Sequence, residues 1–161
     1  MHADNLIARA STAFAGQQPR RINECNCPEC HDFSRLLAGR EPDDIPSAEL
    51  GDGIILLGPA TLAYFVPGIV RFCLSNDPDE GDICNTFVFS ILAQPISKRS
   101  SPECHPKLGE LTVAQTSVIL EILQHVTRSW YNDGEELPRE ISRATANWSW
   151  FLERARICDR P

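Results

Sequence analysis

The chain has 161 residues, of which 42% are hydrophobic, and it carries 22 acidic against 15 basic side chains, a net charge of −7. That length and apolar content suffice for one domain with a buried core, so residues 1–161 are expected to form a single domain. The negative charge argues against nucleic acid as a partner and favours a basic protein surface.

The first residues contain no basic segment followed by a long apolar run, so no signal peptide is predicted and the expected location is the cytoplasm. The seven cysteines should then be reduced thiols or metal ligands. Residues 54–70 form an uncharged run near the lower length limit of a membrane-spanning helix. Because Gly58-Pro59 and Pro67-Gly68 interrupt this run, we expect a buried core segment and no membrane contact.

The first third of the chain has clear helix signals. Residues 4–15 place apolar side chains on one face, which predicts a first amphipathic helix. A second helix is expected to begin at Pro28, with Cys27 or Asn26 as its cap, and to end near Gly39. A short helical turn over residues 48–50 follows a polar connector.

The middle of the chain is harder to assign. The apolar runs 53–57 and 83–93 are compatible with either strands or helices, because periodicity does not separate these structures in short apolar segments. Pro59 should begin a helix that ends near Val66, and Pro67 should begin another. Residues 95–106 have the composition of a loop.

The last third predicts two longer helices. Thr112 and Gln115 match a capping box at the start of a helix over residues 113–130. A second helix over residues 140–156 should bury Trp148 and leave Trp150 outside. The predicted fold is therefore mainly α, a compact helical domain of about six helices, with room for one short β-hairpin.

The densest chemical feature is a run of three cysteines and a histidine within seven residues. Thiolates and imidazole are the ligands that zinc prefers, and a Cys-x-x-Cys step lets two sulfur atoms reach one ion. A second ligand pair lies far along the chain, and its loop could fold back over Cys27 to complete the site. The predicted zinc ligands are Cys25, Cys27, Cys30, His31, Cys104 and His105.

Three other interpretations of this run stay open. A thiol at the start of a helix is acidified by the helix dipole, which would suit thiol–disulfide exchange at Cys27 or Cys30. The spacing Cys-x-x-Cys-His also matches a haem-attachment pattern, although that chemistry ordinarily requires export. Finally, cysteine often acts as a small buried apolar side chain with no chemical role.

Two further features concern partners. Asp77, Asp79 and Glu80 form an acidic turn that fails the ligand register of an EF-hand, so solvation, capping or contact with a basic partner is expected. Trp150 is a candidate interface anchor, because exposed tryptophans often are. The chain lacks the Gly-x-Ser-x-Gly and His-Glu-x-x-His motifs and a phosphate-binding Gly-rich loop.

The order of these motifs resembles an uncharacterised bacterial domain-of-unknown-function family. The matching pieces are the Cys-x-Glu-Cys motif of residues 27–30, the Tyr-x-x-Pro element of residues 64–67 with Arg71, and an apolar helix that starts at Gln115. The resemblance spans residues 14–130, and Cys25 and His31 depart from it. It implies one intact domain in which the thiol motif has a role, and it implies no activity.

The sequence leads to a non-catalytic acidic binding protein, for example of the immunity type, that docks on a basic partner and is stabilised by a structural zinc. The alternative is a thiol-dependent enzyme or redox protein that uses the cluster of Cys25, Cys27 and Cys30. An enzyme is the less favoured of these two classes, because recognisable catalytic motifs are missing.

Overall fold

A computed structural model describes residues 3–23, 25, 27–75, 81–94, 104–105, 107–131, 136 and 138–158. Within these ranges the protein is mainly α, as the sequence predicts. The α-helices are α1 (Ala3–Ala13), α2 (Pro28–Leu37), α3 (Ser47–Leu50), α4 (Pro59–Ser75), α5 (Gly81–Asn85), α6 (Val113–Trp130) and α7 (Arg139–Cys158). Two 3₁₀ segments, a π-helix and a strand pair complete the list: η1 (Pro42–Asp44), η2 (Gly51–Leu56), η4 (Thr86–Leu92), β1 (Cys104–His105) and β2 (Gly109–Glu110).

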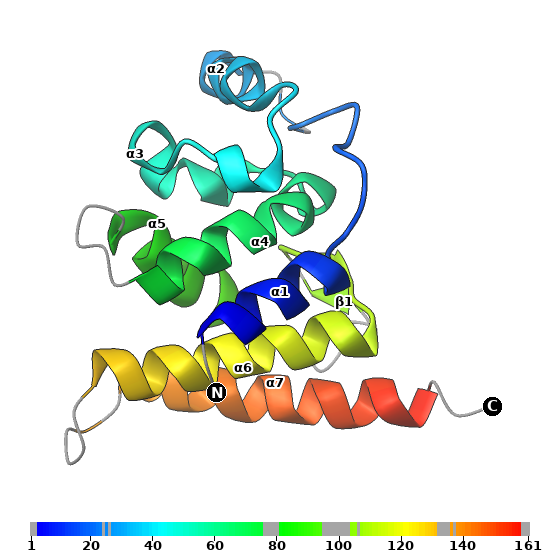
Figure 1. Cartoon of the computed structure of the whole chain (residues 1–161), viewed down its shortest axis with the longest axis vertical. Coiled ribbons are helices and arrows are strands. Elements are labelled where there is room, and N and C mark those ends of the chain that lie inside the picture. Colours follow the sequence, from blue (N-terminus) through cyan, green and yellow to red (C-terminus); the bar gives the residue numbers. More distant parts are fainter. Residues whose placement is uncertain are drawn as a thin grey trace.

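The helices stack from one end of the molecule to the other (Figure 1). The long helices α6 and α7 lie side by side at one end, α1 and α4 occupy the middle, and α2 lies at the opposite end. Helix α1 contacts both α6 and α4, so the middle layer is joined to the α6–α7 pair. The thiol-bearing start of α2 is therefore far from the two long helices.

Helix α6 begins where its local sequence dictates. The Thr112 hydroxyl accepts the backbone N–H of Gln115 at 3.2 Å, and the Gln115 side chain accepts the backbone N–H of Thr112 at 2.8 Å. These reciprocal bonds form the predicted capping box and satisfy two N–H groups that a helix start leaves free. Helix α7 buries Trp148 completely, also as predicted, together with Phe151.

Helix α1 is held to α6 by a bidentate ion pair as well as by apolar contacts. Both guanidinium nitrogens of Arg9 contact the Glu121 carboxylate, and the Arg9 Nη2 to Glu121 Oε1 distance is 2.6 Å. Ser117 donates a further hydrogen bond to Glu121 at 3.2 Å. Leu6 and Ala10 lie on the buried face of α1. The helix thus combines an apolar contact with a directional polar one.

The predicted break at Pro67 is wrong, because α4 runs through this residue as one helix. Proline removes one backbone hydrogen bond and crowds the preceding turn, which usually ends a helix. Here the helix is buried along most of its length, and Phe65, Ile69 and Val70 are fully inaccessible to solvent. The apolar burial of these side chains outweighs the local cost of the proline.

Both ambiguous apolar runs are helical. Residues 51–56 form the 3₁₀ helix η2, and residues 81–92 form α5 followed by the π-helix η4. Thr86 donates a hydrogen bond to the Asp52 carboxylate, which joins η4 to η2. The two runs pack against each other as helices and supply fully buried side chains such as Ile54 and Phe87.

The short hairpin that the sequence left room for is present: β1 lies at the end of the stretch predicted to be a loop, and β2 lies just beyond it. Strands β1 and β2 are antiparallel, and His105 pairs with Gly109. The His105 Nδ1 atom accepts the backbone N–H groups of Lys107 and Leu108 at 3.1 and 3.2 Å. A side chain therefore organises this turn, and no periodic apolar pattern announces it.

No helix among the described residues is long and apolar enough to cross a membrane. The uncharged run of residues 54–70 is divided between η2 and α4, and most of its large side chains lie in the core.

Candidate metal centre

The thiol cluster forms where an extended segment turns into helix α2. Cys27 is the N-cap of this helix, with φ −70° and ψ 158°, and Pro28 occupies the first helical position. Proline suits that position because its missing N–H would have no partner there. The cap residue is one of the two predicted, and its backbone N–H points to the Cys25 sulfur at 3.3 Å.

Three thiols converge at this helix start. The Sγ atoms of Cys25, Cys27 and Cys30 all lie within 4.8 Å of one another. Zinc–sulfur bonds of about 2.3 Å in tetrahedral geometry place two bound sulfur atoms about 3.8 Å apart, so small side-chain rotations suffice to bind one ion. Cys25 is exposed, Cys27 is half-buried and Cys30 is buried. These residues could hold a metal ion.

The hydrogen bonds within the cluster separate the thiol pKa values. The Cys30 backbone N–H, followed by the thiols of Cys25 and Cys30, lowers the pKa of Cys27 by stabilising its thiolate. The hydrogen bond to Cys27, followed by burial, raises the pKa of Cys30 to about 12. In the metal-free protein, Cys27 therefore loses its proton before Cys30 does.

A buried asparagine fixes the loop that carries the cluster. The Asn23 Nδ2 atom donates to the Cys30 carbonyl oxygen at 2.8 Å and to the Ser34 hydroxyl at 3.3 Å. Ser34 also donates to that carbonyl at 2.8 Å. Sequence reasoning missed Asn23, whose only signal is its position two residues before the first cysteine.

The structure does not bring all the predicted ligands together. His31 lies on the exposed side of α2 and does not join the three sulfur atoms. Cys104 belongs to β1, and its side chain lies outside the described set. The expectation that His105 folds over Cys27 fails, because its imidazole stacks on Trp148 with ring centroids 5.0 Å apart. Both rings are completely buried, and the elements that carry them, β1 and α7, lie away from α2 (Figure 1).

Of the predicted partner-binding residues, the structure describes only Trp150. Asp77, Asp79 and Glu80 lie outside the described residues. Trp150 is 41% exposed on α7, as expected, and the Arg154 guanidinium carbon lies 5.4 Å from its ring centroid. That contact already occupies one face of the indole with a cation.

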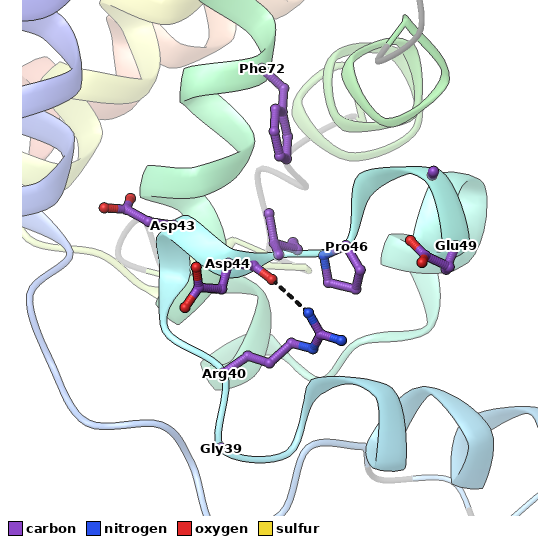
Figure 2. A pocket seen from close by; sticks show the side chains of 9 residues that line it. Gly39, Arg40, Asp43, Asp44, Pro46, Glu49 and Phe72 are labelled. Atoms are coloured by element: carbon purple, nitrogen blue, oxygen red, sulfur yellow. Dashed lines mark hydrogen bonds between the residues drawn. The ribbon is translucent and has the colours of Figure 1, made fainter.

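An acidic cavity that the sequence did not reveal lies beside η1 and α3 (Figure 2). Its volume is about 580 Å³. Arg40, which enters this cavity, donates to the carbonyl oxygens of Leu36 at 2.7 Å and Asp44 at 3.2 Å. Asp43, Asp44 and Glu49 are the acidic residues that line the cavity, and Ile45, Pro46 and Phe72 add apolar surface.

One of these carboxylates is neutralised within the protein. Asp43 forms an ion pair with Arg71 of α4 at 2.6 Å. Arg40 keeps its positive charge and offsets one of the two other carboxylates, Asp44 and Glu49, so the cavity keeps a small negative charge. Eight of its nine lining residues lie within residues 39–49, which the sequence marks only as a polar connector and a helical turn, and Phe72 of α4 is the ninth.

Comparisons with protein-family models, with curated proteins and with solved structures find no match for this chain. The resemblance to an uncharacterised bacterial family therefore stays a prediction, and the function has to be argued from the site itself.

Proposed function

We propose that this protein is a zinc-binding, non-catalytic binding protein of the cytoplasm that docks on a basic partner. The observation that carries the metal part is the convergence of three thiols within 4.8 Å. Soft thiolate ligands favour zinc over magnesium or calcium. Cys25, Cys27 and Cys30 would hold the ion, which would tie the extended segment to the start of α2. Free thiols in this arrangement suit a reducing compartment.

Elemental analysis of untagged, freshly purified protein tests the metal part. The expected result is about one zinc per chain, lost in Cys27→Ser and retained in the matched control Cys84→Ala. Cys84 is a buried free thiol on α5 and lies outside the cluster. Absence of zinc from the wild type, even after incubation with the metal, would remove this part of the proposal.

The docking part rests on charge and shape. The net charge of −7 attracts a basic surface, and the acidic cavity offers carboxylates beside apolar groups that suit the stem of a lysine or arginine. Trp150 supplies an exposed aromatic ring on a different helix. Together these features favour a protein partner of opposite charge.

A charge-matched comparison tests the docking part. Calorimetry with a lysine- and arginine-rich peptide at low salt should show binding that Asp44→Asn/Glu49→Gln weakens strongly. The control Asp4→Asn/Glu153→Gln changes the net charge equally at exposed positions on α1 and α7. Equal weakening in both variants would mean that only the overall charge acts, and not the cavity.

A second candidate, thiol–disulfide chemistry, is supported by the arrangement of Cys27 and Cys30. Cys27 is half-buried at the helix start, and the buried Cys30 lies beside it, as an attacking and a resolving thiol would. Alkylation of the metal-free protein at mildly acidic pH should then modify Cys27 first. Uniformly slow labelling of all thiols would contradict this candidate.

A further inference from the structure

The exposure of the three thiols is graded across the cluster. Cys30 is 2% exposed and belongs to the core side, Cys27 is half-buried, and Cys25 is exposed. An ion that touches all three sulfur atoms therefore has protein on the Cys30 side and solvent on the Cys25 side. The solvent-facing side is where any further ligand would have to approach.

The loop that carries the cluster is fastened independently of any metal. Asn23 is 4% exposed, and its side-chain N–H groups bridge the Cys30 carbonyl and the Ser34 hydroxyl. The Arg21 Nε atom donates to the Asn23 carbonyl oxygen at 2.9 Å. Because these bonds fix both ends of the segment from Asn23 to Cys30, the three sulfur atoms are positioned before an ion arrives.

Among the residues that the structure describes, the three cysteines are the only metal-binding side chains in this cluster, and no fourth ligand joins them. His31 is exposed on α2 and does not belong to this group, and His105 is enclosed beside Trp148. Zinc sites with three protein ligands hold water or another external ligand in the fourth position, as catalytic zinc sites do, whereas structural sites are closed by four protein ligands.

The charge of the cluster favours a neutral fourth ligand. Three thiolates more than neutralise a divalent cation, and the protein itself carries a net charge of −7. A further anionic ligand would add to this negative charge, whereas a neutral nitrogen donor would not. Imidazole is a neutral ligand that zinc and cobalt both accept.

We propose that the metal centre keeps one coordination position open on the Cys25 side and that this position takes a neutral imidazole from a second molecule. This inference rests on the proposed metal site. It makes the centre a docking point, where the histidine side chain of a partner completes the coordination of the ion. The partner is then recognised by a metal bond as well as by charge.

Cobalt-substituted full-length protein provides the test, because the ligand-field bands of Co²⁺ report its coordination directly. Titration with imidazole should shift these bands saturably, and azide, an anionic ligand, should shift them less at equal concentration. His31→Ala and Glu24→Gln, which remove donors adjacent in sequence, should give the same spectra and the same imidazole response. Cys84→Ala serves as the unaffected thiol control.

Each other result overturns the inference in a distinguishable way. A wild-type spectrum that imidazole does not move means that the protein closes its own site. An altered spectrum in His31→Ala or Glu24→Gln that imidazole restores identifies that residue as the fourth ligand. Failure of the wild type to bind cobalt or zinc removes both the proposed metal site and the open position, whereas a bound but inert ion removes only the open position.

Discussion

His105 shows how one buried side chain determines a local structure. Its Nδ1 atom accepts two backbone N–H groups, and its ring stacks on Trp148. The Nδ1 atom thus acts as an acceptor and the neutral ring carries its proton on Nε2, which has no hydrogen-bond partner among the described residues. Protonation of Nδ1 would break both bonds of the hairpin turn.

Burial lowers the pKa of His105 from its ordinary value of 6.5 to about 4. Between these values the unfolded chain binds a proton that the folded protein does not. The free energy of unfolding should therefore be fully retained above pH 6.5 and fall as the pH decreases to 4, by at most about 3 kcal/mol from this residue. Urea denaturation at a series of pH values measures the decrease.

His105→Asn is the comparison variant for this prediction, because its amide oxygen can accept the same two N–H groups without titrating. The difference between the two pH profiles isolates the histidine, since all other acid-titrating groups are shared. A wild-type profile that runs parallel to that of His105→Asn would contradict the role assigned to burial.

Asn23 is a second single residue with a local role, because its side chain supports the loop that carries the metal centre. Asn23→Leu keeps the branching and the number of side-chain heavy atoms but removes the N–H groups that hold the Cys30 carbonyl. Loss of a supporting hydrogen bond of this kind typically weakens metal binding about 10–100-fold. Competition with a zinc chelator measures the affinity, and the melting temperature of the metal-free variant reports whether its fold is retained.

Thr61→Val is the matched control for Asn23→Leu, because Thr61 is also a buried residue whose side-chain oxygen has no hydrogen-bond partner in the described part of the chain. It lies on α4 and should leave the zinc affinity unchanged. Equal affinities in wild type and Asn23→Leu would show that the cysteines alone position the site.

At the scale of elements, the close contact between α4 and η1 determines where the acidic cavity forms. Helix α4 passes so near the Pro42 carbonyl that a Cβ atom on Gly68 would lie 1.9 Å from its oxygen. The Tyr64 hydroxyl contacts the Glu41 carboxylate at 3.2 Å, and Arg71 pairs with Asp43. One face of α4 therefore holds the Glu41–Asp44 segment at three successive turns.

Gly68→Ala should destabilise the protein, because the added methyl group must push backbone aside. Overpacking of this kind costs about 1–3 kcal/mol or more in the free energy of unfolding. Gly16→Ala is the control, since a Cβ at that position meets nothing within 4 Å. Chemical denaturation compares the two, and equal stabilities would show that η1 moves away from α4 without cost.

At the scale of the whole molecule, the thiol cluster and the α6–α7 pair lie at opposite ends (Figure 1). Phe33 of α2 packs on Gly53 of η2, where a Cβ would lie 2.3 Å from the ring. The Gln18 side chain also bonds the end of α2, donating to the Leu37 carbonyl at 2.6 Å and accepting the Gly39 N–H at 2.8 Å. Asn23 bonds the first turns of α2 as well, and because the three thiols lie where this loop meets α2, a bound ion should stabilise this end selectively.

Chelation of the metal should therefore raise hydrogen exchange in α2 more than in α6. The closure of the loop at the start of α2 is lost with the ion, whereas the α6–α7 contact is unaffected. Exchange measured by mass spectrometry with and without chelator checks this expectation. A uniform increase over both helices would indicate that the ion stabilises the fold as a whole.

The sequence by itself determined the helices whose signals are local. The capping box of α6, the proline at the start of α2 and the apolar periodicity of α1 and α7 each act within a few residues. The thiol cluster was also predictable, because Cys25, Cys27 and Cys30 are close in sequence and a helix start turns them toward one another.

Only the tertiary structure decided the features that depend on residues far apart in the sequence. Burial carried α4 through Pro67, and mutual packing made η2 and η4 helical, although the local sequence allowed other outcomes. Stacking on Trp148 drew His105 into the core and away from the thiols. The acidic cavity forms where α4 meets the η1–α3 region. Local patterns cannot specify such contacts, because their free energy comes from surfaces that meet only after the chain has folded.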